Sequence, residues 1–322
     1  MDILRKHSKI VLTVSVILFL TFIFQDKFTL FKNIQTNKIT NVICLFLILT
    51  IGISHGALDH LKGQKILKVL KIYNSFLFYI TYIIIGFLII FLWFLFPTFT
   101  LVIFLIVASF HFGKEDSEFL FKVKKIWYNL IYLTKGLLII IAPLIWHNKE
   151  TIDIFLTLGA DYSFIYHFEN RIEFWNYLGA LTYLIITGYT LFWLELGIGR
   201  NSKFEEDPSI FMADFIPVIL LNMAFTPLIA FTIYFCFIHS FKHSVSLINE
   251  LDNENFRAGT EKFIKKALPL TIVTAISFIL SVYILTNYYV LDDAILKVIF
   301  IGLASLTFPH ILLEYLIEKN EK

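Results

Sequence analysis

The stretch NSFLFYITYIIIGFLIIFLWFLF, residues 74–96, indicates the fold class most directly, because it extends over the width of a membrane without one charged side chain. A helix needs about 20 consecutive apolar residues to cross the hydrocarbon core of a bilayer. Runs of similar length recur along the whole chain, and 58% of its 322 residues are hydrophobic whereas 16% are charged. A soluble domain carries about 25% charged residues. The sequence therefore predicts an all-α, polytopic integral membrane helical bundle.

Apolar runs between clusters of charged residues predict about ten membrane-spanning helices, within a range of eight to ten. The ten runs are 10–24, 39–57, 74–96, 98–112, 126–146, 174–197, 209–224, 227–247, 267–287 and 294–317. The fourth run is short, and the seventh contains Pro217, which is unfavourable inside a helix. No separate soluble domain is evident, so residues 1–322 are expected to form a single integral membrane domain.

The positions of the basic residues predict how these spans are oriented, because cytoplasmic loops are enriched in Lys and Arg. With ten spans and the N-terminus inside, most of the 27 Lys and Arg residues fall in cytoplasmic segments. Both termini are therefore expected in the cytoplasm, and the protein is expected in the cell membrane (inner or plasma membrane). The formal net charge of +2 does not indicate nucleic acid as a partner, and none is expected.

Histidines within the apolar runs are the strongest functional signal. Ionisable side chains at membrane depth are costly and mark functional sites by default. Of the nine histidines, six lie in or at the ends of predicted spans, namely His55, His60, His111, His239, His243 and His310. In the predicted topology they approach one level near the cytoplasmic face, on four helices of the same polarity. Helical bundles build metal sites in this way, so we expect a metal site here.

The spacing of these residues supports a metal site. The stretch HSFKH places His239 and His243 one helical turn apart on one face, where both can bind a single ion. A carboxylate one turn from a metal-ligating histidine can accept the proton of its other ring nitrogen. Three pairs have this spacing: His55 and Asp59, His111 and Glu115, and His310 and Glu314.

Each of these features also has a simpler interpretation. A lone intramembrane histidine such as His310 can be a hydrogen-bonded packing residue, and an i, i+4 histidine pair arises by chance in many helices. Glu115, Asp116 and Glu314 can be solvated acids at the membrane surface. His60 follows His55 by five residues and points well away from it on an α-helix, which makes a shared ion less favourable. The coincidence of six histidines at one depth favours the metal site.

The ligand types narrow the choice of metal. An all-imidazole set adds no charge to that of the ion, and imidazole suits Zn, Cu, Fe and Ni. Four histidines on zinc would close a structural site, whereas four on iron would leave positions open for dioxygen. Oxygen chemistry on a lipid-soluble substrate is the natural inference. The residues themselves do not identify the lipid.

The order of four motifs, SHGALDH, SFHFGKED, FIHSFKHS and FPH, resembles the Brp/Blh family of bacterial and archaeal β-carotene 15,15′-dioxygenases. The resemblance extends from about Gly52 to Glu314. It implies a membrane enzyme with non-haem Fe²⁺ that splits the central double bond of β-carotene with O₂ into two molecules of all-trans-retinal. The implied partners are the lipid bilayer and, as the user of the product, a retinal-binding rhodopsin.

The resemblance also implies roles for individual residues. The four iron ligands of the family match His55, His111, His239 and His243. His60 and His310 match recurring family positions, and they are expected behind the ligands or in the substrate pocket, together with Asp59 and Glu314. Asp59 is expected to orient an imidazole.

Three other classes of protein are less favoured by the sequence. A purely structural membrane protein would leave the clustering of the histidines unexplained. A di-iron membrane hydroxylase or desaturase needs several HxxxH and HxxHH clusters, and this chain has one HxxxH pair. A metal-ion transporter is the main alternative. Its ligands should be distributed through the depth of the membrane, whereas the histidines of this chain gather at one level.

Overall fold

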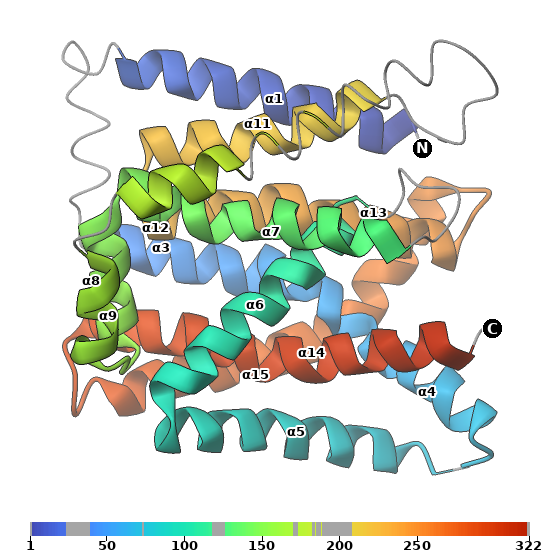
Figure 1. Cartoon of the computed structure of the whole chain (residues 1–322). Coiled ribbons are helices and arrows are strands. Elements are labelled where there is room, and N and C mark those ends of the chain that lie inside the picture. Colours follow the sequence, from blue (N-terminus) through green and yellow to red (C-terminus); the bar gives the residue numbers. More distant parts are fainter. Residues whose placement is uncertain are drawn as a thin grey trace. The chain divides into compact units, whose positions relative to one another are not determined.

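The computed structural model of the chain describes residues 2–23, 39–72, 74–117, 126–169, 173–181, 184, 188 and 208–320. Every secondary-structure element in these residues is a helix, and the described part of the chain contains no strand (Figure 1). The prediction of an all-α fold is therefore confirmed.

Eight of the described helical segments are long and apolar enough to cross a membrane. They are Lys6–Ile23, Ile39–Val69, Phe76–Leu95, Pro97–Glu115, Tyr128–Trp146, Pro227–Leu251, Phe256–Leu285 and Leu291–Asn320. This number lies within the predicted range, and the protein is a multi-pass membrane protein. The predicted sixth span, 174–197, lies largely outside the described residues, and the seventh corresponds to the shorter apolar helix Phe215–Ala224. The orientation of the termini stays a prediction.

The chain forms two compact units, each described here by itself. Unit 1 comprises Met1–Thr40, Leu105–Leu156 and Asp161–Lys242, and unit 2 comprises Asn41–Phe104, Thr157–Ala160 and His243–Lys322. That the whole chain acts as one membrane domain stays a prediction.

In unit 1, α11 (Pro208–Ala224) packs against both α1 (Asp2–Ile23) and α7 (Ile126–Trp146). Figure 1 shows α1 and α11 running alongside each other. The helix α12 (Pro227–Ile233) follows α11 and leads into a π-helical segment, η5 (Tyr234–His239). The HSFKH pair thus begins at the last residue of this π-helical segment.

The later part of α6 (Pro97–Glu115) lies close against α7 because both helices carry a glycine at the contact. A Cβ added at Gly113 would collide with the backbone carbonyl of Tyr132, and one added at Gly136 would collide with the carbonyl of Ser109. The two backbones touch at these glycines, which places the end of α6 beside α7. The shorter helices α8 (Asn148–Thr157) and α9 (Tyr162–Glu169) follow α7 in the chain.

In unit 2, the second predicted span is not one regular α-helix. The helix α3 (Ile39–Leu47) passes into a π-helical segment, η2 (Ile48–Gly52), a 3₁₀ segment, η3 (Ile53–Leu58), and then α4 (Asp59–Val69). Departures of this kind are frequent at functional sites. They extend through ISHGAL, the first part of the motif that contains His55.

The other helices of unit 2 pack around this segment. The helix α15 (Leu291–Asn320) lies beside α5 (Phe76–Leu95), and α14 (Phe256–Leu285) packs against η2, η3 and α15. A buried cluster joins η3 to α13 (Ser240–Leu251) and α14, and its members are Ala57, Leu58, Leu247, Ile248, Phe263 and Ala267. In α5 and in α14, only 11% of the residues in the most apolar stretch of 18 are buried within the protein, which suits helices that face lipid.

The helix α14 begins at Phe256, earlier than the predicted run 267–287. The side chain of Asn255 accepts hydrogen bonds from the backbone amides of Arg257 (3.1 Å) and Ala258 (3.2 Å). Such an N-cap satisfies amides that the first helical turn leaves without partners. Apolar periodicity predicts only the membrane-embedded part of a helix, so the capped polar turns before it were missed.

Candidate functional site

The HSFKH segment lies on helical backbone throughout. His239 is the last residue of η5, and His243 lies in the first turn of α13, which follows directly. Both side chains are buried, with 1% and 8% of their surface exposed. The predicted spacing of one turn therefore falls on a helix, with both imidazoles away from solvent.

In unit 1, His239 belongs to a buried triad with Asp116 and Tyr234, which we call the Asp116 triad. The Nδ1 of His239 donates to Oδ1 of Asp116 at 3.1 Å, and the hydroxyl of Tyr234 donates to Oδ2 at 2.6 Å. The Nζ of Lys135 donates to the backbone carbonyl of Asp116 at 3.0 Å. The imidazole is thus held by a carboxylate that is itself held by a phenol.

Several charges act on Asp116, which lies just beyond the end of its span. Burial alone would raise the pKa of Asp116, but the hydrogen bond and charge of His239 and the charges of Lys242 and Lys135 hold it well below its usual range. An ionised carboxylate accepts hydrogen bonds and cannot donate them. When Asp116 engages Nδ1, Nε2 is the atom of His239 that can ligate a metal.

Aromatic rings surround His239 in the same unit. The ring of His111 lies 5.5 Å from that of His239 between centroids and meets it edge to face. Phe112 lies 4.6 Å away, and Phe235 is stacked on His239 at 5.9 Å. Unit 1 therefore brings together two predicted ligands, His111 and His239, in a buried and largely apolar environment.

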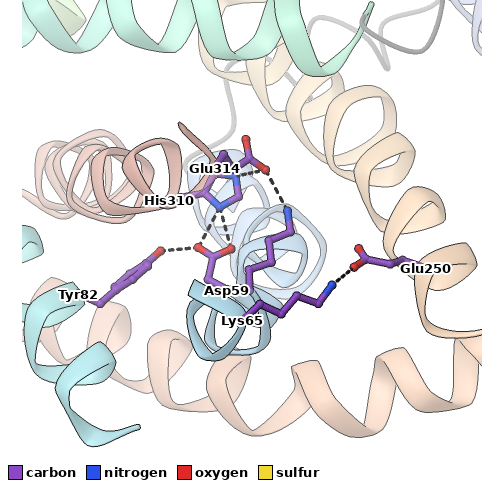
Figure 2. A network of polar contacts seen from close by, with 7 residues as sticks. Asp59, Lys65, Tyr82, Glu250, His310 and Glu314 are labelled. Atoms are coloured by element: carbon purple, nitrogen blue, oxygen red, sulfur yellow. Dashed lines mark hydrogen bonds and ion pairs between the residues drawn. The ribbon is translucent and has the colours of Figure 1, made fainter. Parts of the chain in front are cut away.

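Unit 2 contains a second triad of the same composition, the Asp59 triad, formed by Tyr82, Asp59 and His310 (Figure 2). The hydroxyl of Tyr82 donates to Oδ2 of Asp59 at 2.8 Å, and Nδ1 of His310 lies 2.9 Å from both carboxylate oxygens. The Tyr82 hydroxyl also lies 3.2 Å from the carbonyl oxygen of Leu306. Asp59 thus holds an imidazole, and that imidazole belongs to His310, whereas the sequence spacing pairs Asp59 with His55.

The close approach of α5 and α15 positions this triad. A Cβ added at Gly86, one turn after Tyr82, would lie 3.1 Å from the carbonyl oxygen of Ser305. Pro309 has no amide hydrogen to bond that carbonyl, and it lies directly before His310. A glycine on one helix and a proline on the other therefore mark the contact that places Tyr82 near His310.

A chain of charged groups continues from His310 (Figure 2). Nε2 of His310 lies 3.7 Å from Oε1 of Glu314, and the same oxygen pairs with Nζ of Lys62 at 3.0 Å. The ring of His310 also meets that of His243 edge to face, with centroids 5.9 Å apart. Unit 2 therefore brings together His243 and His310, and it places Glu314 against the second ring nitrogen of His310.

Two other predicted site residues are placed differently. Nδ1 of His60 lies 2.9 Å from the carbonyl oxygen of Ala57, and its ring stacks on Tyr79 with centroids 6.5 Å apart. These contacts are those of a packing residue, and the predicted role of His60 stays a prediction. The backbone of His55 lies in η3, but its side chain lies outside the described part of the chain.

Sequence reasoning missed three of these residues: Asp116, Tyr234 and Tyr82. It paired Asp59, Glu115 and Glu314 with the histidine one turn away, because that is the only proximity that sequence spacing predicts, and it treated Asp116 as a solvated acid. The partners found here are separated by 123 residues for Asp116 and His239, and by 251 for Asp59 and His310. The available signal was the combination of a tyrosine hydroxyl and a carboxylate at membrane depth, since each needs a partner there.

Comparison with known proteins identifies the family. A family model described as beta-carotene 15,15′-dioxygenase matches residues 46–318. The curated beta-carotene 15,15′-dioxygenase of uncultured marine bacterium 66A03 is 28% identical over 278 residues, which cover 84% of this chain and 90% of the relative. No solved structure matches. The matched residues include both triads, and α1 lies outside them. This chain therefore belongs to the β-carotene 15,15′-dioxygenase family.

Proposed function

We propose that this chain is a β-carotene 15,15′-dioxygenase, an enzyme that splits the central double bond of β-carotene with O₂ into two molecules of all-trans-retinal. The observation that carries the proposal is the family match over residues 46–318, together with the relative of the same name. The reaction balances without a further reductant: one C=C and one O=O bond are broken, and two C=O bonds are formed. A retinal-binding rhodopsin is the expected user of the product.

We further propose that His55, His111, His239 and His243 hold a ferrous ion. The described residues fit such an ion, because His111, His239 and His243 are buried and imidazole is a favoured ligand of iron. The bond between Nδ1 of His239 and Asp116 is the arrangement that metal-ligating histidines typically have. When bound, ferrous iron supplies the one-electron chemistry that lets O₂ react with a closed-shell alkene.

The protein's own part in this reaction is positioning and exclusion of water. Asp116 holds the imidazole of His239 in one orientation and one tautomer. Phe112 and Phe235 cover the same ring with apolar surface, which keeps water from it. β-Carotene is itself an apolar molecule, so it is expected to enter from the bilayer. Which double bond is cut would depend on how far the polyene extends on each side of the metal.

The main alternative, a metal-ion transporter, finds no support in the family match. The two functions can be distinguished by measuring iron binding and iron flux with protein reconstituted in sealed vesicles. An enzyme should retain iron without moving it, whereas a transporter should carry iron into sealed vesicles. Flux of iron into vesicles, with no loss of β-carotene, would favour the transporter.

The decisive experiment is expression in a bacterium that accumulates β-carotene, beside His239→Ala at matched membrane levels. We expect loss of β-carotene and appearance of retinal with the native chain only. Growth under ¹⁸O₂, with rapid trapping of the aldehydes, should place one labelled oxygen in each retinal. Unchanged β-carotene despite iron-loaded protein in the membrane would contradict the proposed substrate.

A further inference from the structure

We propose that Tyr234, Asp116 and Tyr82 are positioning residues, and that each compact unit orients one histidine of the HSFKH pair through its own tyrosine–aspartate pair. This inference rests on the proposed function, since it assigns His239 and His243 as ligands. Nothing in the family match assigns a role to these three residues.

In unit 1 the π-helical geometry of η5 makes the Asp116 triad possible. Residues five apart on an α-helix of 3.6 residues per turn point about 140° away from each other. A π-helix closes its turn with a hydrogen bond between residues i and i+5, so residues five apart come close to one face. Tyr234 and His239 are five apart within η5, and their rings lie 6.3 Å apart and nearly parallel.

Both side chains can therefore reach the same carboxylate. Tyr234 takes Oδ2 of Asp116 and His239 takes Oδ1, so each oxygen has one donor. The hydroxyl limits the rotation of the carboxylate, and the carboxylate limits the rotation of the imidazole. A carboxylate on Nδ1 fixes the tautomer of a histidine and raises the basicity of its other nitrogen. The π-helical segment thus orients His239 so that its Nε2 is the atom available to bind the metal.

In unit 2 the orientation of His243 depends on His310. Three helices contribute one residue each to the Asp59 triad: α4 carries Asp59, α5 carries Tyr82 and α15 carries His310. Asp59 faces one nitrogen of His310 and Glu314 faces the other, so the ring is held from both sides (Figure 2). This ring lies against His243, with centroids 5.9 Å apart at 78°. We infer that the ring of His310, held in place in this way, limits the rotation of the His243 ring that it contacts.

The test is removal of each phenolic oxygen with the ring retained, by Tyr234→Phe, Tyr82→Phe and the double variant. Full-length protein is purified in detergent, and kcat and KM for β-carotene, tightly bound iron and the electron paramagnetic resonance spectrum of the nitric oxide complex are measured. We expect kcat to fall roughly 10-fold for Tyr234→Phe, the lower end of effects seen when a partner behind a metal ligand is lost. KM should change little, and the spectrum should broaden.

Matched controls remove a buried or partly buried hydroxyl that donates only within its own helix. Thr232→Val lies on α12, two residues before Tyr234, and loses a bond of 2.7 Å to the carbonyl of Leu228. Thr274→Val lies on α14 in unit 2, and its partly buried hydroxyl loses a bond of 2.9 Å to the carbonyl of Leu270. Both controls should keep native kcat and a native spectrum.

The outcomes separate this inference from the proposed function. If Tyr234→Phe and Tyr82→Phe match their controls in kcat, iron retention and spectrum while the native chain is active, the positioning role is wrong. If the native chain binds iron but leaves β-carotene intact, the substrate assignment fails, and the spectra of the variants still decide the positioning role. A native chain that binds no iron would overturn both.

Discussion

The Asp116 triad and the Asp59 triad contain the same three residue types, but they are assembled in different ways. In unit 1, tyrosine and histidine come from one π-helical segment and meet an aspartate at the end of another helix. In unit 2, the three residues come from three separate helices. The Asp116 triad therefore depends on local backbone geometry, whereas the Asp59 triad depends on how helices pack.

The electrostatic surroundings of the triads also differ. Lys135 donates to the backbone of Asp116, and the charges of Lys135 and Lys242 lie near its carboxylate. The Asp59 triad instead leads to a second acid, Glu314, which is paired with Lys62. The first arrangement suits a carboxylate that serves one metal ligand. The second arrangement holds the imidazole of His310 between two acids, which suits a residue that limits the rotation of the neighbouring His243.

The largest expected effect comes from removing the two aspartates. Asp116→Ala should lower turnover about 100-fold and release iron, because His239 loses the partner that orients it. Asp59→Ala should lower turnover about 10-fold and retain iron, because His310 is not a proposed ligand. Metal analysis and product formation on purified protein measure both. Equal iron loss in the two variants would remove the distinction between the triads.

The next effect tests the close helix contact that supports the Asp116 triad. Gly113→Ala should destabilise the protein by about 2 kcal/mol, because the new methyl group collides with the backbone carbonyl of Tyr132 and the helices must separate. Gly56→Ala is the control, since no atom of the described residues lies within 4 Å of a Cβ at that position. Thermal unfolding in detergent compares them, and equal midpoints would contradict the close contact.

A smaller effect contrasts a buried lysine with an exposed one. Lys135→Met should cost about 1.5 kcal/mol, because it removes a charge-assisted hydrogen bond in a buried position. Lys65→Met removes an ion pair with Glu250 in which both side chains are more than half exposed (Figure 2), and it should cost at most about 0.5 kcal/mol. If Lys65→Met lowered the free energy of unfolding more than Lys135→Met, the role given to Lys135 would be wrong.

A further effect, smaller than that of Lys135→Met, concerns α1, which lies outside the family match. Nε2 of His7 lies 2.7 Å from the carbonyl oxygen of Phe237 within η5, and its ring stacks on Phe241 at 4.3 Å. His7→Leu should cost about 1 kcal/mol of stability through the lost hydrogen bond. Iron content should stay native if α1 only supports η5. A loss of iron in this variant would instead tie α1 to the Asp116 triad.

Part of the site was accessible from sequence because the one-turn spacing of His239 and His243 is a local property of a helix. The burial of both residues agrees with their position in an apolar run. The pairing of His310 with Glu314 was also expected from spacing, and the two approach to 3.7 Å. The assignment of Asp116 to His239 was not accessible, since Asp116 looked like a surface acid at the end of a span.

The positions of the eight apolar helices that the structure describes followed from sequence for a simple reason. The thickness of a bilayer sets the length of an apolar run, and that length can be counted without knowing what the helix packs against. Ends of helices were less predictable, as the capped start of α14 at Asn255 illustrates, because polar turns outside the membrane carry no apolar periodicity.

An all-α membrane protein with histidines inside its apolar runs could be predicted from the sequence, because hydrophobic length and helical spacing are local quantities. Which acid meets which imidazole became known only from the way the helices pack. Those contacts join residues 123 and 251 positions apart and depend on glycine contacts between helices and on a π-helical turn. Such a turn differs from an α-helix by a shift in backbone hydrogen bonds, which the order of side chains does not reveal.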